Sequence, residues 1–185
     1  MTVRNVAVIV GSLRAGSFNR LMAHALAAAA PAPLKLTIVE IGDLVLFNQD
    51  FETGVTPPAY TAFREKVAAM DAVLFVTPEY NRSMPGAMKN AIDVGSRPYG
   101  KSVWNGKPAA IVSVGSGATG GFGANHHLRQ SVVSLNVPIM PAPEAYIGGA
   151  AGLFDEAGNL KSDATKAVIT DFMKSFAAWV ERFAA

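Results

Sequence analysis

The sequence predicts an α/β fold in which a parallel β-sheet is covered by helices on both faces. Short apolar runs alternate with segments whose apolar residues recur at helical spacing, which is typical of repeated β–α units. Half of the 185 residues are hydrophobic and only 16% are charged, which favours a compact chain with a large core. The length suits one domain, so we expect residues 1–185 to form a single unit.

Five stretches are predicted to be strands. Their apolar runs end near glycine or proline, as expected for strands buried on both faces of a parallel sheet. The stretch from 141 to 159 is rich in Gly, Ala and Pro, and we expect it to be a loop. The predicted strands are Val6–Val10, Leu34–Ile41, Ala72–Val76, Ala109–Val114 and a short one near Val137–Met140.

Five segments are predicted to be helices. The first, Phe18–Ala29, is stopped by Pro31, and the second begins at Pro57 and Pro58. A short helix is expected over Pro85–Val94, and a fourth follows the glycines after Val114. The last helix carries an apolar stripe made of Ala164, Val168, Phe172, Phe176, Trp179 and Phe183.

These elements suit a three-layer sandwich with a five-stranded parallel sheet in the flavodoxin-like order 2-1-3-4-5. Ligands of such sheets bind at the carboxyl ends of the strands, beside the point between strands 1 and 3 where the order reverses. The loops after strands 1, 3 and 4 converge there, so these loops are the candidate site.

Composition excludes several classes of function. The chain has no cysteine, which excludes disulfides, iron–sulfur clusters and thiol catalysis, so any redox chemistry must come from a bound cofactor. The net charge is only +2 and no Lys/Arg run is present, so no nucleic-acid partner is expected. No apolar window suits a membrane span and no signal-peptide pattern is found, so we expect no membrane partner and a cytoplasmic location.

The first loop, residues 11–19 (GSLRAGSFN), ends at a helix start, where backbone N–H groups and the helix dipole favour an anion. Ser12, Ser17 and Asn19 add neutral donors, and Arg14 adds a cation that can bind a phosphate through two hydrogen bonds. Ser17 stands where a Walker A loop has lysine, so hydrolysis of nucleoside triphosphates is not expected. The structural alternative is a helix capped by Ser17 with a solvated Arg14.

The second loop, residues 77–86 (TPEYNRSMPG), is polar and is stiffened by prolines. Tyr80 offers a flat apolar face, and the backbone could bind the edge of a planar heterocycle. These residues alone leave open whether the loop binds a ligand or is purely structural.

The third loop, residues 115–123 (GSGATGGFG), contains a G-x-G-x-x-G pattern, but it follows the fourth strand rather than the first. No Asp or Glu follows between Gly121 and Pro143 to hold a ribose. A glycine wall that lets a flat ring approach the backbone is the better interpretation.

No other group of side chains suggests catalysis or metal binding. His126 and His127 are neighbours on a predicted helix and point about 100° apart, so they cannot share a metal. Asp43, Asp50 and Glu52 are expected on a solvated loop. We therefore expect no metal site and no catalytic side chain.

Taken in order, these motifs resemble the NADPH-dependent FMN reductase family, which includes bacterial chromate, quinone and azo reductases. The resemblance covers essentially the whole chain, and its first two motifs together are specific. The motifs are Gly11-Ser12-Leu13-Arg14-x-x-Ser17-x-Asn19, Pro78-Glu79-Tyr80-Asn81, Pro85-Gly86-x-Met88-Lys89-Asn90-Ala91-Ile92-Asp93, the glycine loop Gly115–Gly121 and the loop Leu46–Asp50.

The resemblance implies FMN as the cofactor. The phosphate would be held by the first loop, through Ser12, Arg14, Ser17 and Asn19, with Phe18 beside them. The isoalloxazine ring would be lined, largely by backbone, by Pro78, Glu79, Tyr80 and Asn81, and its other edge by Ser116, Gly117 and Gly120. Arg82 and the pair Val94-Gly95 depart from the family pattern, and we expect them where a neighbouring subunit or the acceptor lies.

The resemblance further implies an enzyme that passes hydride from NADPH or NADH through FMN to small acceptors such as quinones, azo compounds, free flavin or chromate, in a ping-pong mechanism. The alternative is a flavodoxin-type electron carrier, but such carriers are strongly acidic and this chain is slightly basic. A homodimer or homotetramer is expected, both from the family and because several aromatic residues outside the helical stripes would be exposed on a lone subunit. These residues are Trp104, Phe122, Tyr146 and Phe154.

Overall fold

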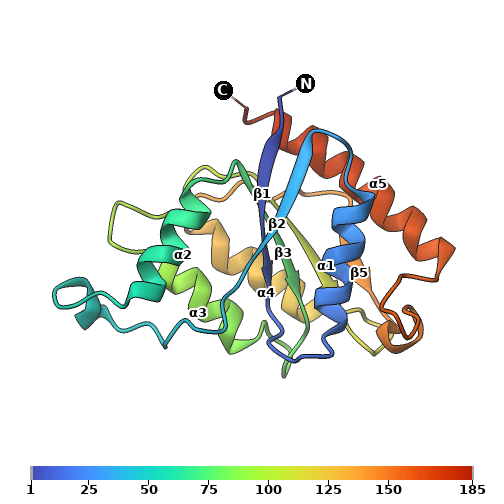
Figure 1. Ribbon diagram of the computed structural model, residues 1–185, viewed down its shortest axis with the longest axis horizontal. Helices are drawn as coiled ribbons and strands as arrows, with labels where there is room; N and C mark the ends of the chain where they lie inside the picture. Colours follow the sequence, from blue (N-terminus) through green and yellow to red (C-terminus); the bar gives the residue numbers. More distant parts are fainter. Residues whose placement is uncertain (1, 185) are drawn as a thin grey trace.

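The computed structural model describes residues 2–184, which form a five-stranded parallel sheet with helices on both faces (Figure 1). The strands are β1 (Arg4–Val10), β2 (Leu34–Val39), β3 (Ala72–Thr77), β4 (Ala109–Val114) and β5 (Ala145–Ile147). The helices are α1 (Phe18–Ala29), α2 (Pro58–Ala68), α3 (Gly86–Gly95), α4 (Phe122–Val133) and α5 (Asp163–Glu181), with short 3-10 turns at Gln49–Glu52 and Ala150–Gly152. The sheet order β2-β1-β3-β4-β5, parallel throughout, confirms the predicted flavodoxin-like arrangement.

Two apolar layers sandwich the sheet, because successive side chains of a strand point to opposite faces. In β1, Val6, Val8 and Val10 pack toward α1 and α5, whereas Ala7 and Ile9 pack toward α2, α3 and α4. All five are buried, which explains why the strand is a continuous apolar run.

The last helix forms as predicted, but its buried stripe is shifted. Val168 and Phe183, which the sequence placed on the stripe, are 51% and 44% exposed. The buried side of α5 is made instead of Ile169, Phe172, Met173, Phe176 and Val180. These residues recur at i, i+3, i+4, i+7 and i+11, which keeps them on the side that faces the sheet.

The fifth strand is not where the sequence predicts it. The chain at Ile139 makes one isolated parallel bridge to Ala109, at the start of β4. Pro141 and Pro143 then interrupt the ladder, because proline has no N–H to donate. Pairing with β4 resumes at Ala145–Ile147, inside the stretch that was expected to be a loop.

Two aromatic residues expected on the surface belong to the core. Trp104 is 1% exposed and Phe154 is 8% exposed, so neither supports the expected exposed patch. Phe122 is 52% exposed and remains a surface residue. Two of the four aromatic residues that motivated the prediction of an oligomer are therefore buried within the chain.

The pair Val94-Gly95 is buried in the core, although the sequence analysis expected it beside a neighbouring subunit or the acceptor. Gly95 makes room for Trp104, since a Cβ on Gly95 would lie 2.6 Å from three atoms of the indole. The indole Nε1 donates to the carbonyl oxygen of Ile92 at 2.9 Å, which fixes the ring against α3. The departure from the family pattern is thus a matter of core packing.

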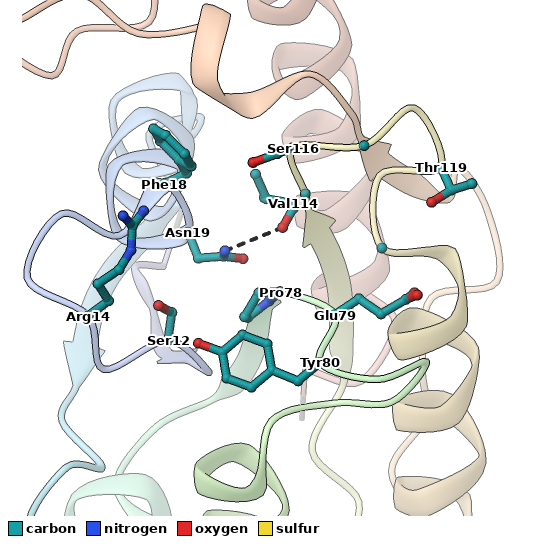
Figure 2. A pocket seen from close by; sticks show the side chains of 13 residues that line it. Ser12, Arg14, Phe18, Asn19, Pro78, Glu79, Tyr80, Val114, Ser116 and Thr119 are labelled. Atoms are coloured by element: carbon teal, nitrogen blue, oxygen red, sulfur yellow. Dashed lines mark hydrogen bonds between the residues drawn. The ribbon is translucent and has the colours of Figure 1, made fainter.

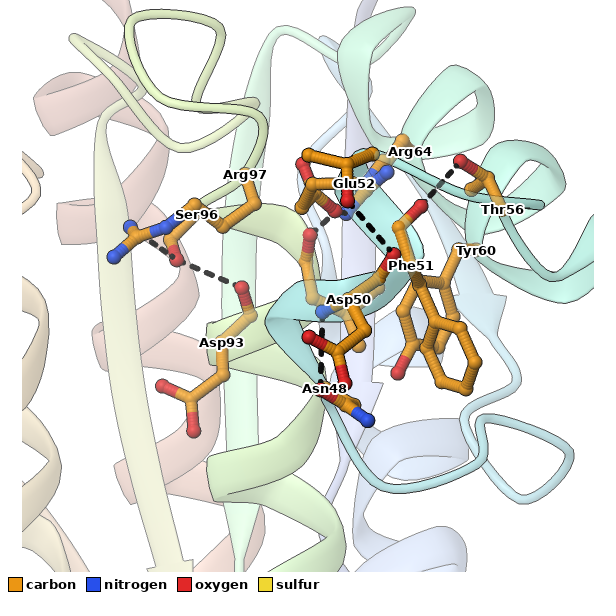
Figure 3. A network of polar contacts seen from close by, with 12 residues as sticks. Asn48, Asp50, Phe51, Glu52, Thr56, Tyr60, Arg64, Asp93, Ser96 and Arg97 are labelled. Carbon is orange, nitrogen blue, oxygen red and sulfur yellow. Dashed lines mark hydrogen bonds and ion pairs between the residues drawn. The ribbon is translucent and has the colours of Figure 1, made fainter.

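A polar network fastens the loop between β2 and α2 onto α3 (Figure 3). Glu52 was expected in solvent, but it pairs with Arg64 at 2.8 Å, and each side chain is only 12% exposed. Arg64 Nε also donates to the carbonyl oxygen of Val94 on α3. Asn90, likewise on α3, accepts a hydrogen bond from the N–H of Phe47 in the loop between β2 and α2. We call Glu52, Arg64 and Asn90 the loop clasp. Asp43 and Asp50 are exposed, as predicted.

None of the helices within residues 2–184 combines the length and hydrophobicity needed to cross a membrane.

Candidate functional site

The three predicted loops surround one cavity of about 500 Å³ at the carboxyl ends of β1, β3 and β4 (Figure 2). This volume lies within the range of small-molecule and cofactor sites. The cavity is lined by Ser12, Arg14, Phe18, Asn19, Pro78, Glu79, Tyr80, Val114, Gly115, Ser116, Gly117, Thr119 and Gly121.

The first loop leaves the sheet at Gly11, whose N–H donates to the carbonyl oxygen of Val76 at 2.9 Å. It ends at Ser17, which caps α1 by accepting a hydrogen bond from the N–H of Arg20. The first turn of α1 contains no acidic residue, so the positive end of its dipole is not neutralised from within the helix.

Arg14 supplies the cation of this loop. Its side chain is exposed, and its guanidinium lies 5.1 Å from the ring centre of Phe18. Within the described part of the chain it has no carboxylate partner, so its donors are available to an anion.

Asn19 has an unmet acceptor on the cavity wall. The residue is 4% exposed, and its Nδ2 makes a long 3.4 Å hydrogen bond to the carbonyl oxygen of Val114 (Figure 2). Its Oδ1 is buried with no hydrogen-bond partner. Leaving a buried acceptor unpaired costs about 1–3 kcal/mol, and a ligand hydroxyl or N–H would remove that cost.

The second loop folds back on itself. The N–H of Tyr80 donates to Ser83 O at 2.9 Å, and the N–H of Ser83 donates to Tyr80 O at 3.1 Å. Asn81 and Arg82 lie between these two residues and have φ angles of 52° and 66°. Two successive positive φ angles are typical of the tight turns that connect hairpins. The turn leaves Tyr80 at the cavity with half of its surface exposed.

The glycine loop is built by close backbone packing. Gly120 has a φ of 57°, and a Cβ there would lie 2.5 Å from the carbonyl carbon of Tyr146. Gly121 follows in the same left-handed region and starts α4. Glycine is required at Gly120 by contact with β5.

The structure brings most of the predicted residues together and leaves three outside the cavity wall. Ser17 is occupied as a helix cap, Asn81 is at the exposed tip of its turn, and Gly120 packs on β5. The cavity also has lining residues that were not individually expected to contact the cofactor, and these are Val114, Gly115, Thr119 and Gly121. Gly115, Thr119 and Gly121 lie in the loop that was predicted to form a glycine wall, and Val114 is the last residue of the strand before it.

The two adjacent histidines point to different partners. His127 Nδ1 lies 2.7 Å from Ser83 Oγ, and His126 Nε2 lies 2.9 Å from Tyr146 Oη. Burial and the neighbouring Glu144 raise the pKa of Tyr146 to about 12, so its hydroxyl is protonated near neutral pH. Across residues 2–184 no cluster of three His, Cys, Asp or Glu side chains could hold a metal ion.

Comparison with known proteins agrees with this geometry. The family model described as NADPH-dependent FMN reductase matches residues 4–152. The chain belongs to the NADPH-dependent FMN reductase family. A quinone reductase from Pseudomonas putida is 60% identical over 97% of this chain and 96% of its own length.

Two further relatives of this reductase support the same conclusion. A 2-hydroxy-1,4-benzoquinone reductase from a Burkholderia species is 46% identical over 95% of each chain. The solved structure of the flavoenzyme NAD(P)H:(acceptor) oxidoreductase FerB from Paracoccus denitrificans has a TM-score of 0.92 at 36% identity, covering 99% of this chain and 100% of that one. The chain is therefore an oxidoreductase whose cofactors are FMN and a nicotinamide dinucleotide.

The residues of the cavity fit FMN. The N-terminus of α1 and Arg14 suit a monophosphate. The unpartnered Oδ1 of Asn19 can accept from a hydroxyl of the ribityl chain. The glycine loop and the face of Tyr80 suit a flat ring.

Proposed function

We propose that this reductase is an NAD(P)H:quinone oxidoreductase with FMN bound in the cavity at the carboxyl ends of β1, β3 and β4. The observation that carries the proposal is the meeting of three groups in one cavity: an unpaired cation at a helix N-terminus, an unpaired buried amide oxygen and a glycine loop. The names of the similar quinone reductases support the choice of acceptor.

Each loop has its own part in binding. Arg14, Ser12, Asn19 and the first N–H groups of α1 would hold the phosphate end, with Phe18 beside them. Ser17 would act indirectly, by fixing the start of α1. Pro78, Glu79 and Tyr80 on one side and Ser116 and Gly117 on the other would border the ring, while Asn81 and Gly120 would shape these two loops from outside the cavity.

FMN, when bound, supplies hydride and electron transfer, which no side chain of the cavity can perform. The protein binds the reactants, orients them and excludes water from between them. Tyr80 is half exposed at the opening, so its ring can pack on a flat partner. The cavity has about 500 Å³ before FMN is bound, and the nicotinamide and the acceptor would share what FMN leaves, so we propose that they bind in turn and that the kinetics are ping-pong.

The range of acceptors, the assembly and the location are proposed mainly from the sequence. Azo compounds, free flavin and chromate are further proposed acceptors, and the geometry favours neither NADPH nor NADH. A homodimer or homotetramer is supported by exposed apolar residues such as Leu46 at 79%, Tyr99 at 93% and Phe122 at 52%. We further propose that the chain acts as one domain and in the cytoplasm.

The test is direct. The purified protein should be yellow and should release FMN rather than FAD on denaturation, as read by chromatography. NADPH or NADH added without oxygen should bleach the flavin absorbance, and a quinone should restore it, with parallel double-reciprocal plots. Mostly FAD, or lines that intersect with every acceptor, would refute the assignment. A flavin that NAD(P)H does not bleach would indicate an electron carrier, and light scattering would report the assembly.

A further inference from the structure

The start of α4 is capped from another part of the chain. Its N-cap residue is Gly121, which has no side chain, and no residue of its own first turn provides a cap. The first N–H groups of a helix need acceptors from outside it. The N–H of Ala124, the third residue of α4, donates to Glu79 Oε2 at 3.1 Å. Glu79 is 45 residues earlier in the sequence and belongs to the second cavity loop.

Glu79 is directed toward this helix start. Figure 2 shows its side chain reaching from the second loop toward α4, on the opposite side from Ser12. Its side chain is only 17% exposed, and its nearest cation is Arg82, at a loose 3.9 Å. A carboxylate at the N-terminus of a helix is also favoured by the helix dipole. The geometry suits a cap better than an acid or base for a reactant in the cavity.

Gly123 permits the close approach of the loop to α4. A Cβ on Gly123 would lie 3.0 Å from Glu79 Oε2 and 3.1 Å from the carbonyl oxygen of Arg82, which is closer than nearly all Cβ contacts. A second contact lies one turn further along α4, where His127 Nδ1 and Ser83 Oγ are 2.7 Å apart. The second loop is therefore attached to α4 at two points.

We propose that Glu79 is a positioning residue for the flavin. Its carboxylate caps α4 and thereby holds loop 78–83 and the glycine loop 115–121 at a fixed spacing across the cavity. Without this cap the two walls can separate, and flavin binding has to bring them together again. The inference rests on the proposed location of FMN in this cavity, and it assigns to Glu79 a role through its side chain in addition to any backbone contact.

The test compares Glu79→Ala, Glu79→Gln and Gly123→Ala. In the apoprotein, hydrogen exchange at the Ala124 amide should be faster in Glu79→Ala than in wild type. The dissociation constants of FMN and of riboflavin should both rise about fivefold in that variant, because losing a cap typically costs about 1 kcal/mol and both ligands contain the ring. Glu79→Gln should stay close to wild type, because its amide oxygen can still accept from Ala124.

Gly123→Ala should weaken both flavins like Glu79→Ala, although alanine is the better helix former. Gly152→Ala is the matched control, since a Cβ there meets nothing within 4 Å. Unchanged exchange at Ala124 would overturn the cap, and faster exchange with unchanged flavin affinity would overturn the positioning role. If Glu79→Ala does not fold, Glu79→Gln and Gly123→Ala still test the inference. Failure of the proposed site itself would show differently, as an Arg14→Ala variant that binds FMN normally.

Discussion

Two buried asparagines show how the cavity differs from the loop clasp. Asn90 is 7% exposed and uses its whole amide: Oδ1 accepts from Phe47 N at 2.7 Å, and Nδ2 donates to two carbonyl oxygens of the β2–α2 loop at 3.1 and 3.0 Å. Asn19 is 4% exposed, makes one long hydrogen bond and leaves Oδ1 without a partner. The first amide holds a loop in place, and the second leaves an acceptor unpaired in a residue that lines the cavity.

The arginines of the two regions differ in the same way. Arg64 of the clasp is used up by Glu52 and by the carbonyl oxygen of Val94, whereas Arg14 at the cavity has only the ring of Phe18 against it. An unmet hydrogen bond alone does not mark a ligand site, because Glu52 Oε2 also lacks a partner. Asn19 differs because its residue lines an open cavity beside a free cation.

The largest expected effect is on the clasp. Arg64→Ala would leave Glu52 almost buried without its counter-ion, and breaking a buried pair from one side typically costs about 3–5 kcal/mol of unfolding free energy. Urea denaturation of the apoprotein would measure the loss. The dissociation constant of FMN should change by less than about twofold, since no residue of the loop clasp lines the cavity.

A double variant, Arg64→Met with Glu52→Met, is the control. It removes both charges and should recover most of the stability lost by Arg64→Ala, because an apolar pair of similar volume is often as stable as the ion pair. A double variant no more stable than Arg64→Ala would show that packing around Arg64, and not its charge, holds the loop.

The asparagine pair should divide stability from binding. Asn90→Ala removes three hydrogen bonds and should lower the stability of the apoprotein by about 2–3 kcal/mol, with little effect on FMN affinity. Asn19→Ala should cost the apoprotein less than about 1 kcal/mol, because it also removes an unpaired acceptor, yet it should weaken FMN about tenfold. Thermal melts and flavin titrations of the two variants would measure both effects. The comparison fails if both variants lose stability and affinity in equal proportion.

Arg14→Ala should act on binding alone. A hydrogen bond to a charged partner contributes about 1.5–3 kcal/mol, so FMN should bind about 10- to 100-fold more weakly. Arg14→Lys should recover part of the loss, since lysine keeps the charge but not the planar fork. Riboflavin has no phosphate, so its affinity should be nearly indifferent to Arg14→Ala. FMN affinity within about twofold of wild type, or an equal loss for riboflavin, would show that Arg14 is only a solvated residue.

The sequence predicts the fold well wherever a signal is local. Continuous apolar runs identify β1 to β4, and their alternation with helices leads to the observed sheet order. The fifth strand was misplaced because Val137–Met140 is apolar enough for a strand, while pairing along β4 is set by the position of Pro141 and Pro143. Which stretch of the chain pairs with β4 depends on tertiary packing, and local hydrophobicity alone does not identify it.

The same limit applies to the site. The loops, their anion-binding character and most lining residues could be predicted, because glycines and helix starts have local signatures. The roles of Glu79 and Gly95 could not, because each depends on a distant partner: Ala124 for Glu79 and Trp104 for Gly95. Glu52 was placed in solvent for the same reason, since its partner Arg64 lies on the following helix.

The smallest expected effect concerns an ion pair next to the cavity helix start. Arg20 on α1 binds Glu40 through two hydrogen bonds of 2.8 and 2.6 Å, a more complete geometry than that of Arg64 and Glu52. The side chains of Arg20 and Glu40 are 34% and 62% exposed, however, so water screens the pair and it adds little to the free energy of unfolding. Arg20→Met should therefore lower stability by only about 0.5 kcal/mol at neutral pH, against about 3–5 kcal/mol for Arg64→Ala.

Acidification should remove even that small difference. Hydrogen bonds from Arg20 lower the pKa of Glu40 from its ordinary value of 4.5. A carboxylate with a lowered folded-state pKa contributes its stability above the unfolded value and loses it as the pH falls through the folded value. The unfolding free energies of wild type and Arg20→Met, measured in urea, should thus differ at pH 7. They should converge as the pH falls below the pKa of Glu40 in the folded protein. A gap that persists in acid would mean that Arg20 stabilises α1 by packing its stem rather than by its charge.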